Sequence, residues 1–287
     1  EAFDEAQATL PVQYSLAERP RHRVLEELRR VFAIQGEVGE GLLRRIVTTY
    51  YAMGKFLDVQ VGRVLAELKR SGLDDRTLVI YTSDHGEMLG DHGLWTKCCF
   101  YDGSVAIPLI VAGPGVPVGR ASRLSSLVDV FPTVLEWFGI DRVADDGISA
   151  PGLSLLSAED AAGARKFVFA EYHATGFENA GYMIRSDRYK YVEYVDGPPQ
   201  LFDLVADPRE LHDLATSEQH HGVLDAHAAT LRSVCDPGAT NAAAHADQRA
   251  EIERLGGEAK IRSAPMYTYT PVPSEFEPEP DEYAVGE

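Results

Sequence analysis

Two short apolar runs constrain the fold of this chain most. Thr77–Thr82 reads TLVIYT and Ile107–Gly113 reads IPLIVAG, and neither alternates regularly between polar and apolar side chains. Such runs are typical of parallel strands that are covered on both faces of a sheet. Apolar residues recur every three or four positions over residues 42–68 and over residues 130–138, which predicts helices before and after the two strands. We therefore expect an α/β sheet with packed helices.

Other local patterns predict an additional helix in this first half and the bounds of the long one. The pattern at Arg21–Arg30 predicts an additional short helix. The long helix over residues 42–68 could be broken at Gly54, and Ser71-Gly72 predicts its end.

The second half of the chain follows a different pattern. After a Gly-, Pro- and Ser-rich segment at residues 147–157, short aromatic runs are joined by tight turns such as Ser186-Asp187-Arg188. This predicts a small antiparallel sheet followed by a helix at residues 219–234. Residues 240–262 are predicted to be helical, and the Pro-rich, acidic tail that follows is expected to be extended. We divide the chain into an α/β part (1–150), a small α+β subdomain (151–239) and a helical segment with its tail (240–287).

Charge and cysteine content limit the classes of partner. The chain has 27 Lys and Arg against 45 Asp and Glu, a net charge of −18, which disfavours nucleic acid and an anionic membrane as main partners. An anionic ligand must then be held by locally placed cations. The sequence contains no run of about 18 apolar residues, so no membrane span is predicted. The three cysteines include the neighbours Cys98 and Cys99 and form no disulfide framework, which predicts a reducing compartment such as the cytoplasm.

Asp84 and His85 directly follow the first apolar run. In open α/β sheets, ligands bind beyond the carboxyl ends of strands, where consecutive side chains can converge. A carboxylate and an imidazole presented together suit a divalent metal ion. The alternative is that Asp84 caps a helical turn and His85 is an ordinary loop histidine.

A long collinear pattern around this pair resembles the sulfatase family of the alkaline-phosphatase-like superfamily. It includes Asp84–Lys97, DHGEMLGDHGLWTK, and covers residues 45–215 in the family's order. The other matching segments are Tyr50–Met53 with Asp58, Gly72–Ile80, Gly103–Val111, Gly181–Arg185, Tyr189–Val192, Gln200–Leu204 and Asp207–Glu210. Choline-sulfatase-like and phosphonate-monoester-hydrolase-like members are the most similar. The resemblance implies part of an αβα sandwich, followed by a small antiparallel sheet with a packed helix.

The resemblance also implies roles for individual side chains. Asp84 and His85 correspond to metal ligands, and Lys97 corresponds to the catalytic cation that binds the sulfate oxygens. A divalent ion and an ammonium group stabilise the negative charge that a sulfate ester gains during displacement. The alternative for Lys97 is a solvated surface lysine. His92 and His173 are candidates for substrate contact, with a loop-ordering hydrogen bond and a structural role as their respective alternatives.

The implied cofactors lie partly outside this sequence. The resemblance implies calcium as the metal. The family's strict calcium sites pair Asp with Asn, whereas this sequence has His85, so manganese or another transition ion is an alternative. The family's nucleophile is a formylglycine made in a Cys/Ser-x-Pro-x-Arg motif of the N-terminal half. The segment Cys235–Ala239 imitates this motif but has Ala239 where Arg is required. The resemblance therefore implies the C-terminal portion of a longer sulfatase, with the N-terminal half as its partner.

The predicted function is hydrolysis of a small sulfate monoester by a sulfuric ester hydrolase. Two alternatives stay open: a phosphonate or phosphate ester hydrolase of the same superfamily, and a non-catalytic subunit that binds a sulfated ligand. The extended tail could also reach a second copy of the chain in a homo-oligomer.

Overall fold

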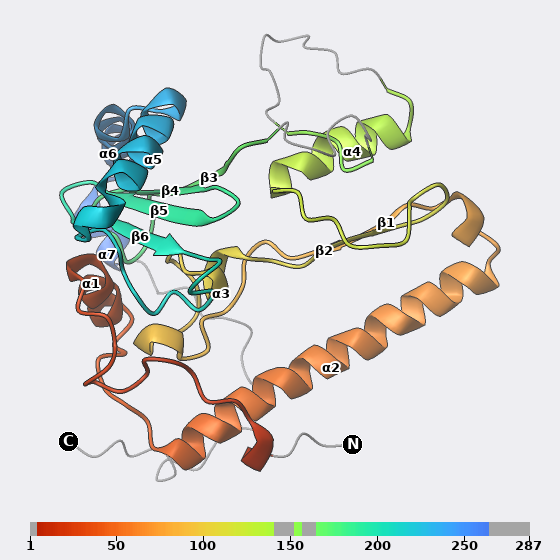
Figure 1. The fold of residues 1–287 in the computed structure, drawn as a ribbon, viewed down its shortest axis with the longest axis horizontal. Coiled ribbons are helices and arrows are strands. Elements are labelled where there is room, and N and C mark those ends of the chain that lie inside the picture. The colour runs from red at the N-terminus through yellow and green to blue at the C-terminus, as the bar shows by residue number, and fades with distance from the viewer. Residues whose placement is uncertain (1–4, 141–151, 157–164, 264–287) are drawn as a thin grey trace. The chain divides into compact units, whose positions relative to one another are not determined.

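The computed structural model describes residues 5–140, 152–156 and 165–263 (Figure 1). Residues Glu1–Asn241 form one compact unit and residues Ala242–Glu287 form a second. Helices combine with antiparallel sheets, which confirms the mixed α/β class. The predicted domain boundaries at residues 150 and 239 stay predictions.

Two helices precede the first strand, as the sequence predicts. α1 spans Arg23–Val31, and α2 spans Glu40–Arg70 without interruption, so the predicted break at Gly54 was wrong. One glycine lowers the stability of a helix by only about 1 kcal/mol, which a helix of this length tolerates. α2 ends where predicted, because Gly72 adopts a φ of +63° that closes the last turn. In the described part of the chain, no helix combines the length and the apolar character that a bilayer crossing requires.

The first pair of strands corrects the sequence prediction. β1 (Val79–Thr82) and β2 (Leu109–Ala112) form a two-stranded antiparallel sheet, with Val79 opposite Ala112. The expectation of parallel strands covered on both faces was therefore wrong. Ile110 is 58% exposed, so one face of β2 is uncovered in the described structure. Short β-branched runs report strand formation but not strand direction, because both pairings accept the same residues.

The connections around these strands are short helices and loops. In chain order the short helices are η1 (Glu5–Gln7), η2 (Asp74–Arg76), η3 (Asp91–Gly93), α3 (Asp102–Val105) and η4 (Leu127–Asp129). α4 (Val130–Trp137) follows η4 and confirms the helix predicted at residues 130–138.

The small antiparallel sheet is confirmed. Its strands are β3 (Val168–Tyr172), β4 (Gly181–Arg185), β5 (Tyr189–Tyr194) and β6 (Gln200–Asp203), joined in the order β3-β4-β5-β6 (Figure 1). After η6 (Glu218–His220), the helix α5 (His221–Val234) packs its buried Leu231 against β4 and β5. The sequence places α5 correctly to within two residues at its start.

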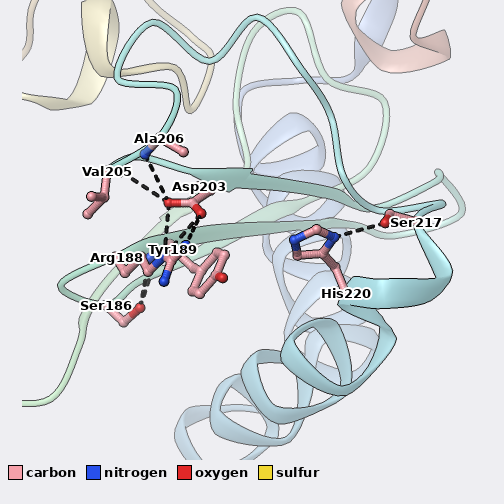
Figure 2. Close-up of polar contacts among 8 residues, drawn as sticks. All are labelled: Ser186, Arg188, Tyr189, Asp203, Val205, Ala206, Ser217 and His220. Atoms are coloured by element: carbon pink, nitrogen blue, oxygen red, sulfur yellow. Dashed lines mark hydrogen bonds and ion pairs between the residues drawn. The ribbon is translucent and has the colours of Figure 1, made fainter.

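A carboxylate fixes the turn that leaves β6. Asp203 accepts hydrogen bonds from the backbone N–H groups of Val205 and Ala206, and from the Arg188 guanidinium at 2.7 Å (Figure 2). The hydrogen bonds from Arg188 hold the pKa of Asp203 below its ordinary value. In the turn between β4 and β5, the Ser186 hydroxyl accepts the Tyr189 N–H, as expected for a tight turn at this place.

The C-terminal region is helical as predicted, up to the end of the described residues. α6 begins at Pro237 and ends at Arg254, and α7 spans Glu258–Ser263. The predicted extended tail, with its proposed role in a homo-oligomer, lies outside the described residues.

Candidate functional site

The segment between β1 and β2 carries the predicted site residues, and apolar packing fixes it. Met88, Leu94, Cys98 and Cys99 are buried in one cluster with Leu25 and Leu28 of α1 and Phe202 of β6. Burying one such side chain stabilises the fold by about 1.5–3 kcal/mol. The segment is therefore held between α1 and the small sheet, and Cys98 and Cys99 are buried core residues.

Glycine and a carboxylate shape the start of this segment. The Gly86 N–H bonds the Ser104 carbonyl at 2.8 Å, and a Cβ at Gly86 would lie 2.1 Å from the carbonyl oxygen of Gly103. Only glycine allows this close backbone approach. Glu87 Oε1 accepts the Leu89 N–H at 3.0 Å and the Thr96 N–H at 2.5 Å, which closes the loop that leads to Lys97.

Asp84 and His85 lie at the end of β1 with their polar atoms close together. Asp84 Oδ2 is 3.6 Å from His85 Nε2, and the two side chains are 84% and 40% exposed. His85 Nδ1 lies 2.8 Å from the Gly86 carbonyl oxygen, so in the neutral ring Nδ1–H donates there and Nε2 keeps its lone pair. The backbone N–H of His85 lowers the pKa of Asp84 and keeps the carboxylate ionised. This anchoring of one ring nitrogen is typical of metal-ligating histidines.

These two side chains supply an oxygen and a nitrogen donor. Such a pair suits a divalent metal ion that accepts both kinds of ligand. Within the described residues, no group of three or more His, Cys, Asp and Glu side chains could hold a metal ion. The donor set therefore fits part of a metal site, and further ligands are needed to complete it.

Lys97 is exposed and follows a strained backbone. Thr96 and Cys98 on either side of it adopt φ values of +64° and +77°. A left-handed conformation at a β-branched residue such as Thr96 is rare and costs about 1–3 kcal/mol. Where the chain is described, Lys97 has no hydrogen bond or ion pair, and none joins it to Asp84 or His85. The role of Lys97 at the sulfate group and its alternative as a solvated surface lysine both stay open.

His92 is buried, and its contacts favour the loop-ordering alternative. Its ring stacks on Tyr101 at a centroid distance of 4.0 Å, and Nδ1 lies 2.8 Å from Gln13 Oε1. The backbone N–H of His92 bonds the Val12 carbonyl at 2.8 Å. With an exposed fraction of 3%, the side chain has almost no surface for a substrate.

The buried His92 gives the protein a predicted acid sensitivity. Burial, with Arg209 and Arg29 as further causes, lowers the pKa of His92 from 6.5 to about 4. The unfolded chain takes up the proton near pH 6.5 and the folded protein only near pH 4, so stability is lost as the pH falls through this window. We expect the free energy of unfolding to fall by about 2 kcal/mol between pH 7 and pH 5 from this group.

Urea unfolding at both pH values measures this effect. The His92→Gln variant should lose that part of the pH dependence, whereas His221→Gln, which changes an exposed histidine at the start of α5, should retain it. Equal pH dependence in wild type and His92→Gln would contradict the prediction.

His173 lies beyond the end of β3 and is partly exposed. Its Nε2 is 3.3 Å from Glu171 Oε2, and its ring meets Tyr182 edge-on at 5.5 Å. These contacts suit a structural histidine. Its contact with a substrate stays a prediction.

Two buried cations that the sequence analysis missed hold the segment in place. Lys190 of β5 is fully buried, donates to the Phe100 carbonyl at 2.9 Å and forms ion pairs with Asp102 and, at 2.7 Å, with Glu210. Arg29 of α1 donates to the carbonyl oxygen of His92 at 2.7 Å. Arg29 lies among other charged residues of α1 and Lys190 lies among aromatic strand residues, so no local pattern marks either of them as buried.

Comparisons with known proteins find relatives over most of the described chain. A family profile described as Sulfatase matches residues 4–140, and one described as N-sulphoglucosamine sulphohydrolase, C-terminal, matches residues 90–235. Arylsulfatase K of Gallus gallus is 39% identical over 189 residues, which cover 63% of this chain and 35% of that protein. The Choline-sulfatase of Rhizobium meliloti (strain 1021) is 38% identical over 189 residues, covering 66% and 36%. This chain thus spans about a third of the length of these relatives.

Solved structures show the same likeness. Phosphonate monoester hydrolase SpPMH from Silicibacter pomeroyi superposes with a TM-score of 0.68 at 26% identity, over 80% of this chain and 51% of that one. Both family profiles, the curated relatives and this structural likeness agree in the family that they indicate. The chain belongs to the sulfatase family.

Proposed function

We propose that this chain is part of a hydrolase of sulfate monoesters. The observation that carries the proposal is the pairing of Asp84 Oδ2 with His85 Nε2 at the end of β1, where Gly86 anchors the other ring nitrogen. Lys97, exposed and without an ion pair in the described structure, is the cation for the sulfate group. Membership of the sulfatase family supports the same chemistry.

Asp84 and His85 would hold a divalent metal ion, which supplies positive charge for the oxygens of the ester. Calcium is the first candidate for this ion, because the Asp84 carboxylate supplies the oxygen ligands that calcium prefers. The His85 imidazole favours manganese or another transition ion. Lys97 would bind a peripheral sulfate oxygen, and its flexible stem would let the ammonium follow the charge as it develops. The formylglycine nucleophile belongs to the N-terminal half that we propose as the partner of this chain.

The exposed side of α2 supports such a partner. Met53, Phe56 and Val64 are 64%, 68% and 67% exposed. Several large apolar side chains exposed on one helix are typical of a surface that another protein segment covers. We propose that the N-terminal half of the enzyme covers α2 and supplies the remaining metal ligands.

A phosphonate or phosphate ester is the second candidate substrate. The likeness to the phosphonate monoester hydrolase SpPMH supports it, because sulfate and phosphonate esters share a tetrahedral centre. The curated relatives are sulfatases, which places the sulfate ester first. A non-catalytic subunit that holds a sulfated ligand is the third candidate.

Paired kinetics separate these candidates. With the complete protein that contains this chain, we expect kcat/KM for an aryl sulfate to exceed kcat/KM for the matching phenyl phosphonate monoester. The reverse order would favour the second candidate. Binding of the aryl sulfate without release of sulfate would favour the non-catalytic subunit.

A further inference from the structure

A pocket of about 480 Å³ lies at the N-terminal end of α1, away in sequence from the Asp84–Lys97 segment. Its lining combines Leu16, Arg19, Arg21, His22, Arg23 and Glu26. A volume in this range is typical of sites for small molecules. The function proposed above makes no use of this pocket.

The charges in the lining are unusual for a chain with a net charge of −18. Three arginines line the pocket against a single glutamate, which leaves two positive charges in excess. Glu26 is already engaged, because its Oε1 accepts a hydrogen bond from Arg29 Nη1 at 3.1 Å. The pocket is therefore a local cationic site of the kind that an acidic protein needs to hold an anion.

None of the three arginines is neutralised by a carboxylate in the described structure. Arg19 Nη1 donates to the Gln35 carbonyl at 2.7 Å, and Arg23 donates to the Asp196 carbonyl. Arg21 is exposed and has no hydrogen bond or ion pair with any described residue. All three guanidinium groups thus keep donors for a ligand.

His22 forms part of the wall of the pocket and adds no charge to it. It has an exposed fraction of 8%, and its Nε2–H donates to the Pro198 carbonyl oxygen at 2.9 Å, so the buried Nδ1 of the neutral ring is an acceptor and the arginines supply the donors for an anion. His22 is also the residue before the first turn of α1, and its side chain makes no capping hydrogen bond. The free N–H groups of a helix start add to the attraction for an anion.

We propose that this pocket binds a doubly charged tetrahedral oxyanion, namely a sulfate or phosphate group. The excess of two positive charges matches such a dianion, and guanidinium groups bind its oxygens in pairs. The exposed Arg21 makes the first contact, and Arg19 and Arg23 enclose the anion from the adjacent turns of the chain.

Isothermal titration calorimetry of the complete protein with sodium sulfate and with sodium phosphate, at constant ionic strength in sodium chloride, tests the proposal. We expect saturable binding of at least one of the two anions, and the tighter one identifies the ligand group. The Arg21→Glu variant should weaken this binding by about tenfold or more, whereas Arg21→Lys, which keeps the charge, should weaken it by about threefold or less.

The matched control is Arg30→Glu, which changes the net charge equally at an exposed residue of α1 outside the pocket lining. It should bind the anion as wild type does. Equal weakening by Arg21→Glu and Arg30→Glu would reduce the effect to net charge and overturn the proposal. Absence of saturable binding of both anions to wild type would also overturn it. Neither result would bear on the sulfatase activity, whose proposed residues are left unchanged.

Discussion

Replacement of Lys190 by methionine is expected to lower the free energy of unfolding by about 3–5 kcal/mol, because it leaves the buried carboxylate of Glu210 without its cation. Lys190 has no exposed surface, and Glu210, its partner at 2.7 Å, is 3% exposed. Burial already raises the pKa of Glu210, and Lys190 is the main group that opposes this shift. Urea unfolding measures the loss.

A double variant separates the missing charge from the changed packing. Lys190→Met with Glu210→Gln removes both charges and should be destabilised less than Lys190→Met alone. Lys69→Met, on the exposed end of α2, should change the free energy of unfolding by about 0.5 kcal/mol or less. A loss below about 1 kcal/mol in Lys190→Met would show that the ion pairs do not fix the loop that carries Asp84 and Lys97.

Replacement of Lys97 by alanine is expected to lower kcat for sulfate ester hydrolysis by about 10²–10³-fold in the complete protein. In the proposed function the ammonium group stabilises the charge that develops on the ester, so its loss should act on the reaction rather than on the fold. Because Lys97 is exposed and has no partner in the described structure, the thermal stability should stay that of wild type.

Lys69→Ala provides the matched control, since it also removes an exposed lysine. It should keep the wild-type kcat. Wild-type kcat in Lys97→Ala would return Lys97 to the alternative of a solvated surface lysine.

Local patterns predict the elements of this fold well. The helices α1, α2, α4 and α5 and the order of the small sheet all follow from periodicity and turn residues within short windows. Strand direction does not, because Val79 pairs with Ala112 over a separation that no local pattern reports. The predicted break at Gly54 is absent because the helical turns on both sides outweigh one residue that disfavours a helix.

The site is only partly predictable, because contacts between residues far apart in the sequence leave no local pattern. Asp84 and His85 are neighbours in the sequence, so their proximity follows from the strand end alone. The residues that hold their segment lie far away in sequence, such as Lys190, which contacts Phe100. A buried lysine among aromatic strand residues cannot be distinguished by pattern from an exposed one, because the two faces of a strand alternate.

The affinity of the complete protein for Ca²⁺ and Mn²⁺, measured by equilibrium dialysis, tests most directly whether Asp84 and His85 are ligands of one metal ion. We expect tight binding of one of these ions to wild type, and an affinity lower by about 100-fold or more in Asp84→Asn. Asp75→Asn, which alters an exposed aspartate before β1, should bind as wild type does. Equal affinity of wild type and Asp84→Asn would contradict the metal site.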